Sequence, residues 1–279
     1  MMDLRTAFRQ GAKLLEDAGI DSPRLTAEVL LTHATGKNRT YFLAHPEELI
    51  TELAWIHYGR YLHQRLERMP TQYITRKQEF WGRAFRVERG VLIPRPETEH
   101  MIETVLAECP SAEGIVDVGV GSGAIAVTLA LELKTAVVAT DISPDALRIA
   151  CFNVETYKAP VSLIQCDLAS ALADKSMELF ISNPPYVPEK DKSAMEPEVT
   201  NWEPSQALFA GVDGLAIYPR LISEAMRVLR PAGMFMAEIG IHQKEAITAM
   251  LTGDWTGVHF VNDLAGIPRI AVAVKGSYV

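Results

Sequence analysis

Apolar residues recur at helical spacing along the first quarter of the chain. Between residues 4 and 68 they fall three or four positions apart, which predicts helices with one apolar face each. Ser22-Pro23 is a favourable start for the second helix, because proline suits the first helical position. The apolar face of the third and longest helix is predicted to hold Leu53, Ile56, Tyr58, Leu62 and Leu66. We therefore expect residues 1–72 to form a small helical domain.

A different pattern follows between residues 73 and 93. Aromatic and β-branched residues gather there, and Gly82 and Gly90 interrupt them, which predicts a β-hairpin that links the two parts of the chain. Pro94 and Pro96 then break the strand, and a helix is predicted to begin at Glu97.

From residue 114 onward, short apolar runs alternate with amphipathic stretches. The runs near residues 115–119, 136–140, 161–165, 177–183 and 234–240 predict buried strands, and two more are expected near residues 256–262 and 269–275. Helices are predicted between them, at 124–133, 144–157, 215–229 and 243–251. This alternation indicates an α/β fold in residues 94–279, with a mostly parallel seven-stranded sheet covered by helices on both faces. Such sheets bind ligands at the carboxyl ends of their strands.

Composition and charge narrow the possible functions. The net charge is −8 and the pI is about 5.4, whereas a protein that grips nucleic acid through its phosphates is usually basic. The three cysteines form no Cys-x-x-Cys pair and the seven histidines show no zinc-binding spacing, so we expect no disulfide framework and no metal site. No apolar run approaches membrane-spanning length, and the N-terminus makes a poor signal peptide. A cytoplasmic monomer is the default expectation.

The first strand of the α/β part is followed by a glycine-rich turn. Gly119, Gly121 and Gly123 stand at alternate positions, where glycine permits a ligand to approach the backbone closely. The spacing differs from that of dinucleotide sites and phosphate-binding loops, and no basic residue stands nearby in the sequence. Asp141 ends the second strand and can accept hydrogen bonds from two ribose hydroxyls. Asp167 and Leu168 follow the third strand, where an adenine ring can lie, so a nucleoside without phosphates fits this edge.

The fourth strand ends in Asn183-Pro184-Pro185-Tyr186. The two prolines fix the backbone and remove two N–H donors, which leaves carbonyl oxygens free to accept hydrogen bonds. With the Asn183 side-chain oxygen, these carbonyls can receive both protons of a planar NH2 group, and Tyr186 can offer its ring to that group. A nucleoside without phosphates suggests S-adenosylmethionine, a methyl donor. The motif is thus predicted to hold the nitrogen of an amide or aromatic amine in line with the methyl group, without a strong general base.

These motifs together resemble a known family. The chain is similar to the class I, Rossmann-like methyltransferases with an Asn-Pro-Pro-Tyr motif, and within them to the peptide chain release factor N5-glutamine methyltransferases, the HemK/PrmC family. The most specific matching stretch is VLIPRPETE at residues 91–99, and other matches extend from Pro70 to Gly266. Val120 departs from the family, which usually has threonine there. Arg95, Glu97 and Glu238 lie in matching stretches, where orienting or structural roles are expected.

The resemblance implies an activity, a cofactor and a site. It implies methyl transfer from S-adenosyl-L-methionine, with S-adenosyl-L-homocysteine as product, to the glutamine of the Gly-Gly-Gln motif in peptide chain release factors 1 and 2. Residues 1–72 would then help to recognise this protein substrate. The predicted catalytic and substrate-binding residues are Asn183, Pro184, Pro185 and Tyr186. The predicted cofactor-binding residues are Gly119, Val120, Gly121, Ser122, Gly123, Asp141, Asp167, Leu168 and Asn183.

Three alternatives remain open on the sequence. The same chemistry would serve a glutamine methyltransferase of a ribosomal protein, or an adenine-N6 methyltransferase of RNA or DNA. The acidic catalytic part argues against a direct nucleic-acid substrate. A binding module that has kept the fold without the activity is the third, and the intact glycine turn, Asp141 and Asn-Pro-Pro-Tyr argue against it.

Overall fold

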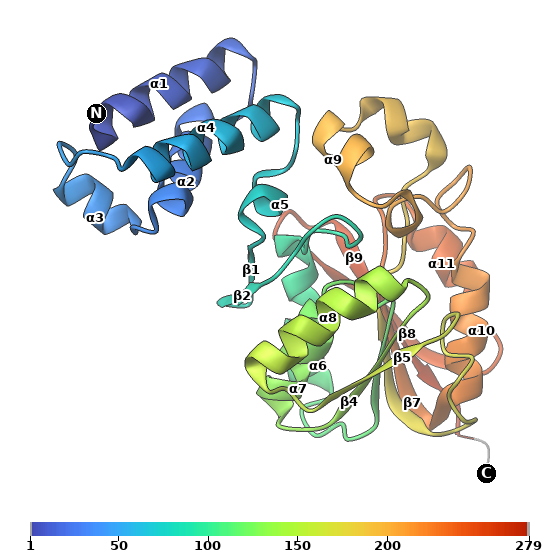
Figure 1. Ribbon diagram of the computed structural model, residues 1–279. Helices are drawn as coiled ribbons and strands as arrows, with labels where there is room; N and C mark the ends of the chain where they lie inside the picture. The colour runs from blue at the N-terminus through green and yellow to red at the C-terminus, as the bar shows by residue number, and fades with distance from the viewer. Residues whose placement is uncertain (1, 278–279) are drawn as a thin grey trace. The chain divides into compact units, whose positions relative to one another are not determined.

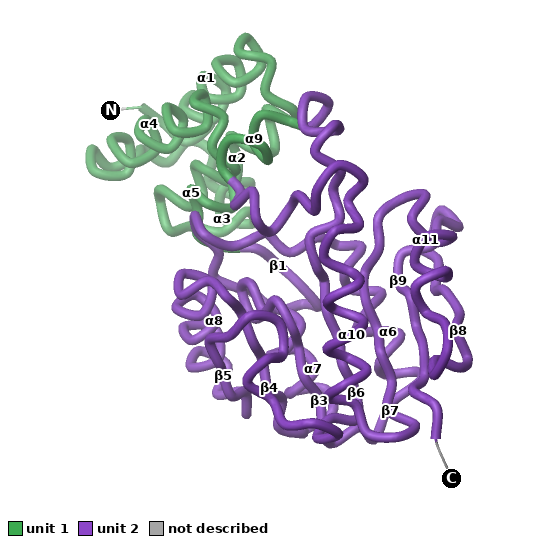
Figure 2. The backbone as a smooth tube through the Cα atoms, turned by 90° about the vertical axis from the view of Figure 1, so that its right-hand side faces the viewer, with its two compact units in different colours: residues 1–77, 196–202 green, residues 78–195, 203–279 purple. Residues whose placement is uncertain are grey.

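The structure is a computed structural model that describes residues 2–277. The chain divides into two compact units, shown in different colours in Figure 2. The smaller unit comprises Met1–Lys77 and Glu196–Trp202, and the larger comprises Gln78–Met195 and Glu203–Val279. Each is described by itself below.

The smaller unit is helical, as its apolar periodicity predicts (Figure 1). Its helices are α1 (Leu4–Asp17), α2 (Pro23–Thr35), α3 (Arg39–Ala44), α4 (Glu52–Leu66), α5 (Thr71–Thr75) and α9 (Pro197–Trp202). The predicted start of α2 at Pro23 is confirmed. Tyr58 and Leu62 are buried in the core of this unit, but Leu53 and Ile56 are 64% and 57% exposed, so their predicted place on a buried face is wrong. Helix α4 therefore buries only a narrow apolar stripe of its surface, and Leu53 and Ile56 lie outside it.

Helix α9 joins the smaller unit although it lies more than a hundred residues further along the chain. Arg65 on α4 and Glu198 on α9 form an ion pair with 2.8 Å between Nη1 and Oε1, and both side chains are largely buried. Arg68 approaches the same carboxylate at 3.5 Å. These charges lower the pKa of Glu198 against the opposing effect of its burial.

The larger unit contains the predicted α/β fold. Its strands are β1 (Gln78–Phe80), β2 (Arg83–Phe85), β3 (Ile115–Val118), β4 (Val137–Asp141), β5 (Val161–Gln165), β6 (Met177–Ser182), β7 (Leu229–Glu238), β8 (Trp255–Asn262) and β9 (Pro268–Lys275). Its α-helices are α6 (Glu99–Glu108), α7 (Ala124–Leu133), α8 (Pro144–Tyr157), α10 (Tyr218–Val228) and α11 (Lys244–Met250). Three 3₁₀ turns are η1 (Pro96–Thr98), η2 (Glu189–Ala194) and η3 (Ser205–Ala207). None of the helices in residues 2–277 has the length and hydropathy to cross a membrane.

The large sheet has seven strands in the order β5-β4-β3-β6-β7-β9-β8. Strands β3 to β7 pair in parallel and β9 runs antiparallel to both β7 and β8, so the mostly parallel sheet is confirmed. The chain passes outward from β3 through β4 to β5 and then returns to β6 on the other side of β3. The strand order therefore reverses beside β3, which is where such sheets bind ligands.

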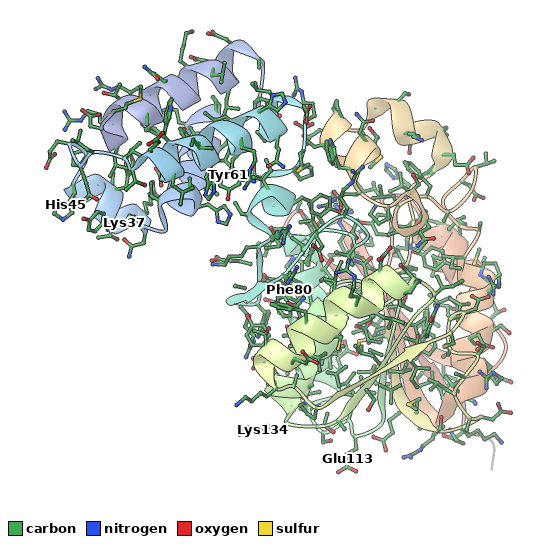
Figure 3. All side chains as sticks on the ribbon, viewed as in Figure 1. Lys37, His45, Tyr61, Phe80, Glu113 and Lys134 are labelled. Atoms are coloured by element: carbon green, nitrogen blue, oxygen red, sulfur yellow. The ribbon has the colours of Figure 1, made fainter. Side chains whose placement is uncertain are left out.

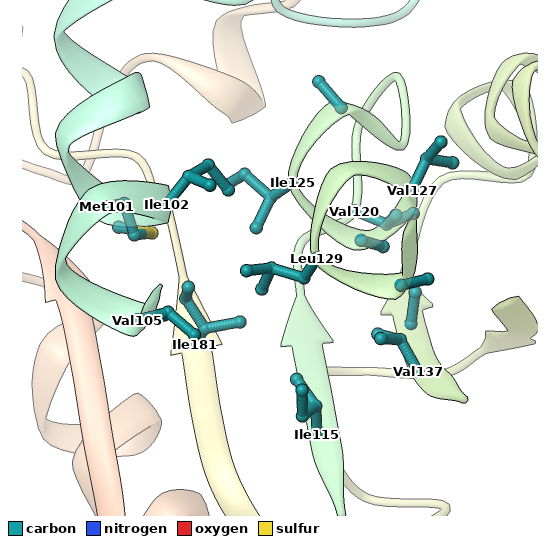
Figure 4. Packing of buried hydrophobic residues seen from close by; sticks show 14 of the residues in the cluster. Met101, Ile102, Val105, Ile115, Val120, Ile125, Val127, Leu129, Val137 and Ile181 are labelled. Atoms are coloured by element: carbon teal, nitrogen blue, oxygen red, sulfur yellow. The ribbon is translucent and has the colours of Figure 1, made fainter. Parts of the chain in front are cut away.

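Alternate strand residues face opposite sides of the sheet, and each side is covered by helices. Ile115, Leu179 and Ile181 belong to a cluster with residues of α6 and α7, part of which Figure 4 shows. Val116 and Phe180, their neighbours in sequence, belong to a second cluster with residues of α10 and α11. Helices on both faces of the sheet are thus confirmed.

The segment predicted to link the units differs from the expectation. The antiparallel hairpin is limited to β1 and β2, because Tyr73 lies in α5 and residues 86–95 form no strand. Nor is the hairpin a separate linker, since Phe80 (labelled in Figure 3) and Phe85 are buried in the core of the larger unit. The β-prone Val91 and Ile93 are also buried, but in a loop, because the following prolines oppose a continued strand. The compact units divide after Lys77, whereas domain boundaries are expected from the sequence at residues 72 and 93.

Candidate active site

A cavity of about 350 Å³ opens at the carboxyl ends of β3, β4 and β6. Its volume is near the lower end of the range for small-molecule sites. Its wall includes Gly119, Val120, Gly121, Ser122, Asp141, Asp167, Leu168, Asn183, Pro184 and Pro185, which brings together most of the predicted site. Phe80, the loop from Gly90 to Pro94, Thr98, Gln206 and Arg220 complete much of the rest.

The glycine turn leaves space at the cavity floor. Gly119 and Gly121 have φ angles of +81° and +52°, which favour glycine. A Cβ atom built on Gly119 would meet no heavy atom within 4 Å, and one on Gly121 would meet only the Gly119 carbonyl, at 4.0 Å. A ligand can therefore approach the backbone of both residues.

Two other residues of the turn have structural roles of their own. Val120 is 5% exposed, packs in the core and donates its N–H to the Thr140 carbonyl at 2.9 Å. Gly123 does not line the cavity; a Cβ there would stand 3.4 Å from the backbone and side chain of Ala150, so its lack of a side chain lets α7 start close to α8. The predicted cofactor contact of Gly123 stays a prediction.

The acidic residues of the cavity wall already have protein partners. Asp141 accepts the Gly121 N–H at 3.0 Å and the Ser143 N–H at 2.8 Å, which fixes its carboxylate beside the turn. Asp167 accepts a hydrogen bond from Arg220 at 2.6 Å. The sequence suggested no basic residue near the turn, but Arg220 reaches the cavity wall from α10, 53 residues further on. Carboxylate oxygens have further lone pairs, so Asp141 can still accept hydroxyl protons.

Asp117 lies beneath the turn and is fully buried. Its Oδ2 accepts the Ala126 N–H at 3.1 Å, whereas its Oδ1 has no hydrogen-bond partner. Burial, together with the nearby charge of Asp141, raises the pKa of Asp117 to about 7, against the opposing effect of the Ala126 hydrogen bond. This carboxyl therefore favours its protonated form over part of the physiological range.

The raised pKa of Asp117 predicts that the stability of the protein depends on pH. Between its ordinary pKa of 3.8 and about 7, the folded chain holds a proton that the unfolded chain has released. Its contribution to the free energy of unfolding therefore falls as pH rises through this window, by an amount on the order of a few kcal/mol. Asp117→Asn keeps an acceptor for Ala126 but does not titrate. In urea titrations at pH values spanning that window, the difference in stability between variant and wild type should grow in favour of the variant as pH rises; a constant difference would contradict this assignment.

Asn183 connects the cavity to a chain of buried polar groups. Its Nδ2 donates to Thr98 Oγ1 at 3.1 Å, and Thr98 Oγ1 donates to Glu238 Oε2 at 2.7 Å. The Asn183 Oδ1 is buried and has no hydrogen-bond partner. A buried acceptor without a donor is costly, so this oxygen is free for a ligand that brings one.

Tyr186 completes the other side of this group. Its hydroxyl donates to Glu238 Oε1 at 3.0 Å, and burial raises the pKa of that hydroxyl. Burial also raises the pKa of Glu238, whereas the hydroxyls of Thr98 and Tyr186 and the charge of Arg269 lower it. Tyr186 is not part of the cavity wall, so its predicted ring contact with a substrate stays a prediction.

A buried carboxylate holds the loop that covers one side of the cavity. Glu203 accepts the Ile93 N–H at 3.0 Å through Oε2 and a guanidinium hydrogen bond from Arg95 at 2.6 Å through Oε1. The Glu203 side chain is 2% exposed, so its carboxylate depends on these two donors for hydrogen bonds. The pair ties the loop before η1 to the segment around η3, and both line the cavity.

Similarity to known proteins decides the family. Residues 6–75 match the family model described as the PrmC N-terminal domain, and residues 97–200 match the methyltransferase small domain. The release factor glutamine methyltransferase of Koribacter versatilis is 41% identical over 278 residues, covering 98% of this chain and 99% of that protein. The chain belongs to the release factor glutamine methyltransferase family. As a member of this family it is a methyltransferase.

Other matches agree with this family. The release factor glutamine methyltransferase of Caulobacter vibrioides is 36% identical, covering 98% of this chain and 97% of that protein. A methyltransferase from Pyrococcus furiosus has the same fold, with a TM-score of 0.53 at 14% identity, over 71% of this chain and 91% of that structure. So does the 16S rRNA N2 methyltransferase of Thermus thermophilus in complex with AdoMet and guanosine, with a TM-score of 0.52 at 16% identity, over 71% of this chain and 49% of that structure. The class I methyltransferase fold is thus confirmed.

The sequence did not reveal the roles of some residues at this site. Thr98 lies inside the VLIPRPETE stretch but carries no signal of its own there. Arg220 lies on α10, where the apolar periodicity predicts which side of the helix is buried but not which residue reaches the cavity. Glu238, expected to be orienting or structural, receives two hydroxyl hydrogen bonds beside the cavity. Among residues 2–277, no group of three or more His, Cys, Asp or Glu side chains is arranged to hold a metal ion.

Proposed function

We propose that this enzyme transfers a methyl group from S-adenosyl-L-methionine to the side-chain amide nitrogen of the glutamine in the Gly-Gly-Gln motif of peptide chain release factors 1 and 2. The observation that carries the proposal is the buried Asn183 Oδ1, an acceptor with no protein partner that belongs to a residue lining the cavity. A primary amide supplies the N–H donor that this oxygen lacks. The names of the relatives supply the protein substrate.

The cavity fits a nucleoside-like cofactor. Gly119 and Gly121 would admit it to the backbone, and Asp141 would accept ribose hydroxyls. Asp167 and Leu168 would lie beside its adenine ring. Arg220, a basic residue of the wall, is engaged by Asp167, which suits a ligand without phosphates. When bound, S-adenosyl-L-methionine supplies an electrophilic methyl group on a sulfonium.

The residues at the end of β6 would hold the nucleophile. The lone pair of an amide nitrogen is delocalised into the carbonyl group, so this nitrogen attacks poorly. Asn183 Oδ1 would accept a hydrogen bond from one N–H of this nitrogen, and the carbonyl oxygens of the Asn-Pro-Pro segment from the other, which favours the positive charge that develops as the N–CH3 bond forms and the sulfonium–CH3 bond breaks. The methylated nitrogen would then release one proton to solvent, which restores the amide. Pro184 and Pro185 lie on the cavity wall and restrict the backbone that presents these acceptors. The remaining advantage is alignment of the nitrogen with the methyl group.

The smaller unit would recognise the protein substrate. Helix α4 exposes Leu53, Trp55 and Ile56, by 64%, 38% and 57%. Large apolar side chains grouped on one exposed helix are typical of protein-binding surfaces. A release factor acts in translation, so the cytoplasm is the proposed place of action.

The proposed function is tested by labelled methyl transfer. The enzyme is incubated with methyl-labelled S-adenosylmethionine and, separately, with purified release factor, ribosomal proteins, RNA and DNA. We expect label on the release factor, mapped by mass spectrometry to the Gly-Gly-Gln glutamine. The matched control is a release factor with that glutamine changed to asparagine, which keeps the amide but shortens the side chain by one methylene; it should receive no label.

Each other outcome has a distinct meaning. Label on a ribosomal protein alone, or on nucleic acid alone, would replace the proposed substrate. Cofactor binding without transfer to any of the four would point to a binding module. Label retained on the asparagine variant of the release factor, and mapped away from that asparagine, would place the reaction at another residue.

A further inference from the structure

The hydrogen bonds around Asn183 form a chain with a defined direction. Asn183 Nδ2 lies 3.1 Å from Thr98 Oγ1, which lies 2.7 Å from Glu238 Oε2. Thr98 and Glu238 are 4% and 3% exposed, so water does not complete these contacts. Every bond in the chain must therefore be made between protein groups.

This series of hydrogen bonds determines which way the Asn183 amide points. The oxygen and NH2 ends of an amide are nearly alike in size, so their hydrogen-bond partners decide the orientation. Glu238 accepts from Thr98 at one oxygen and from Tyr186 at the other, so both of its oxygens act as acceptors in this arrangement. The single proton of the Thr98 hydroxyl is thus committed to Glu238, and its oxygen can only accept from Asn183. The NH2 end of Asn183 then faces Thr98 and the Oδ1 end is left without a protein partner.

The reversed amide is disfavoured by the same contacts. If Asn183 turned its oxygen toward Thr98, the hydroxyl would have to donate to it, and Glu238 Oε2 would lose its donor. A buried carboxylate oxygen without a hydrogen bond is strongly unfavourable. The NH2 end would also face the donor group of the substrate, and two donors repel.

We infer that Glu238 and Thr98 are positioning residues that hold the Asn183 amide with its oxygen toward the substrate nitrogen. Neither needs to touch the substrate. The inference rests on the proposed function, since it assigns the orientation of the acceptor for the methylated amide. It extends the Asn-Pro-Pro-Tyr motif to a threonine 85 residues before it and a glutamate 55 residues after it.

The test compares two substitutions at Thr98. Thr98→Val has nearly the same shape but neither accepts from Asn183 nor donates to Glu238, whereas Thr98→Ser keeps the hydroxyl. At saturating cofactor and release factor, we expect Thr98→Val to lower the single-turnover methyl-transfer rate by up to about 100-fold. Thr98→Ser should stay within about 3-fold of wild type, a bound set by the retained hydrogen bonds. The KM for the release factor should change little in both, because neither substitution removes a group that is proposed to touch the substrate.

Glu238→Gln provides a second variant of nearly unchanged shape. Its amide has a donor end that must face either Thr98 or Tyr186, both of which donate to Glu238 in the wild type. One of these hydroxyls therefore loses its acceptor, and the Thr98 proton becomes free to turn toward Asn183. We expect the transfer rate to fall by about 10-fold, with cofactor affinity within about 2-fold of wild type. Unchanged thermal unfolding and cofactor binding would show that each variant folds.

A readout that needs no turnover separates this inference from the proposed function. The side-chain NH2 signal of Asn183, assigned as the one missing from the Asn183→Ala spectrum, should exchange slowly with solvent in wild type and Thr98→Ser. It should exchange faster in Thr98→Val. A folded Thr98→Val protein with wild-type transfer rate and slow exchange overturns the inference. A wild-type enzyme that leaves the release factor unlabelled overturns the proposed function instead, while the exchange data still decide the orientation of Asn183.

Discussion

Asn183→Ala is expected to lower the rate of methyl transfer to a release factor by about 100- to 1,000-fold, the usual cost of losing one acceptor or donor matched to transition-state charge. The physical reason is the loss of Oδ1, the buried acceptor without a protein partner. The alanine also leaves Thr98 Oγ1 without the donor that now lies 3.1 Å away. Single-turnover kinetics at saturating cofactor measure the effect directly.

Two further substitutions control this experiment. Asn262→Ala makes the same chemical change at an exposed position on β8 of the larger unit, and should leave the rate near that of wild type. Asn183→Asp keeps an acceptor but loses the donor to Thr98 and brings a second carboxyl group toward Glu238, so an intermediate rate is expected. Asn183→Ala with a rate within a few-fold of wild type would refute the proposed role of Oδ1.

Gly214→Ala is expected to reduce the stability of the larger unit by about 2–4 kcal/mol and to reduce activity as well. Gly214 has a φ of +76°, and a Cβ there would stand 2.2 Å from the Tyr186 carbonyl oxygen and 2.7 Å from Gln243 Nε2. Gln243 Nε2 donates to the same carbonyl at 3.0 Å. The added methyl must therefore displace the backbone of the Asn-Pro-Pro-Tyr segment.

Gly82→Ala separates the strain of the backbone from this collision. Gly82 has a similar φ of +66°, but a Cβ there would meet no atom within 4 Å. In Gly82→Ala the free energy of unfolding should fall only by the cost of placing alanine in the left-handed conformation, about 1–2 kcal/mol. The activity should be retained. Urea titration and transfer assays of both variants give the comparison. Equal losses of stability, with activity unaffected in both, would show that Gly214 does not support the site.

Much of the α/β unit could be predicted because its signals are local. Helices α7 and α8 begin and end at the predicted residues. For α8 the reason is visible in Ser143, whose side chain accepts the Ala146 N–H at 3.2 Å, followed by proline at the first helical position. The glycine turn and Asp141 also follow directly from strand ends, and parallel strands bring their carboxyl ends to one edge.

Apolar residues were placed less reliably where the sequence does not show what they pack against. The pattern of α4 places Leu53 and Ile56 among apolar neighbours, but none of the described helices of the smaller unit covers them and they remain exposed. Val91 and Ile93 have strand-forming side chains, yet they are buried in a loop held by Glu203. β-propensity reflects burial as much as backbone preference, so it does not distinguish a buried strand from a buried loop such as the one that holds Val91 and Ile93.

The sequence by itself determined the α/β fold, the position of the cavity at the ends of β3, β4 and β6, and the residues of its floor. Periodicity and turn residues act over a few positions, and this is why they could be recognised. Only the tertiary structure joined α9 to the N-terminal helices, brought Arg220 to Asp167 and connected Asn183 through Thr98 to Glu238. These contacts join residues far apart in the chain, and burial makes their hydrogen bonds obligatory, so the folded packing alone selects the partners.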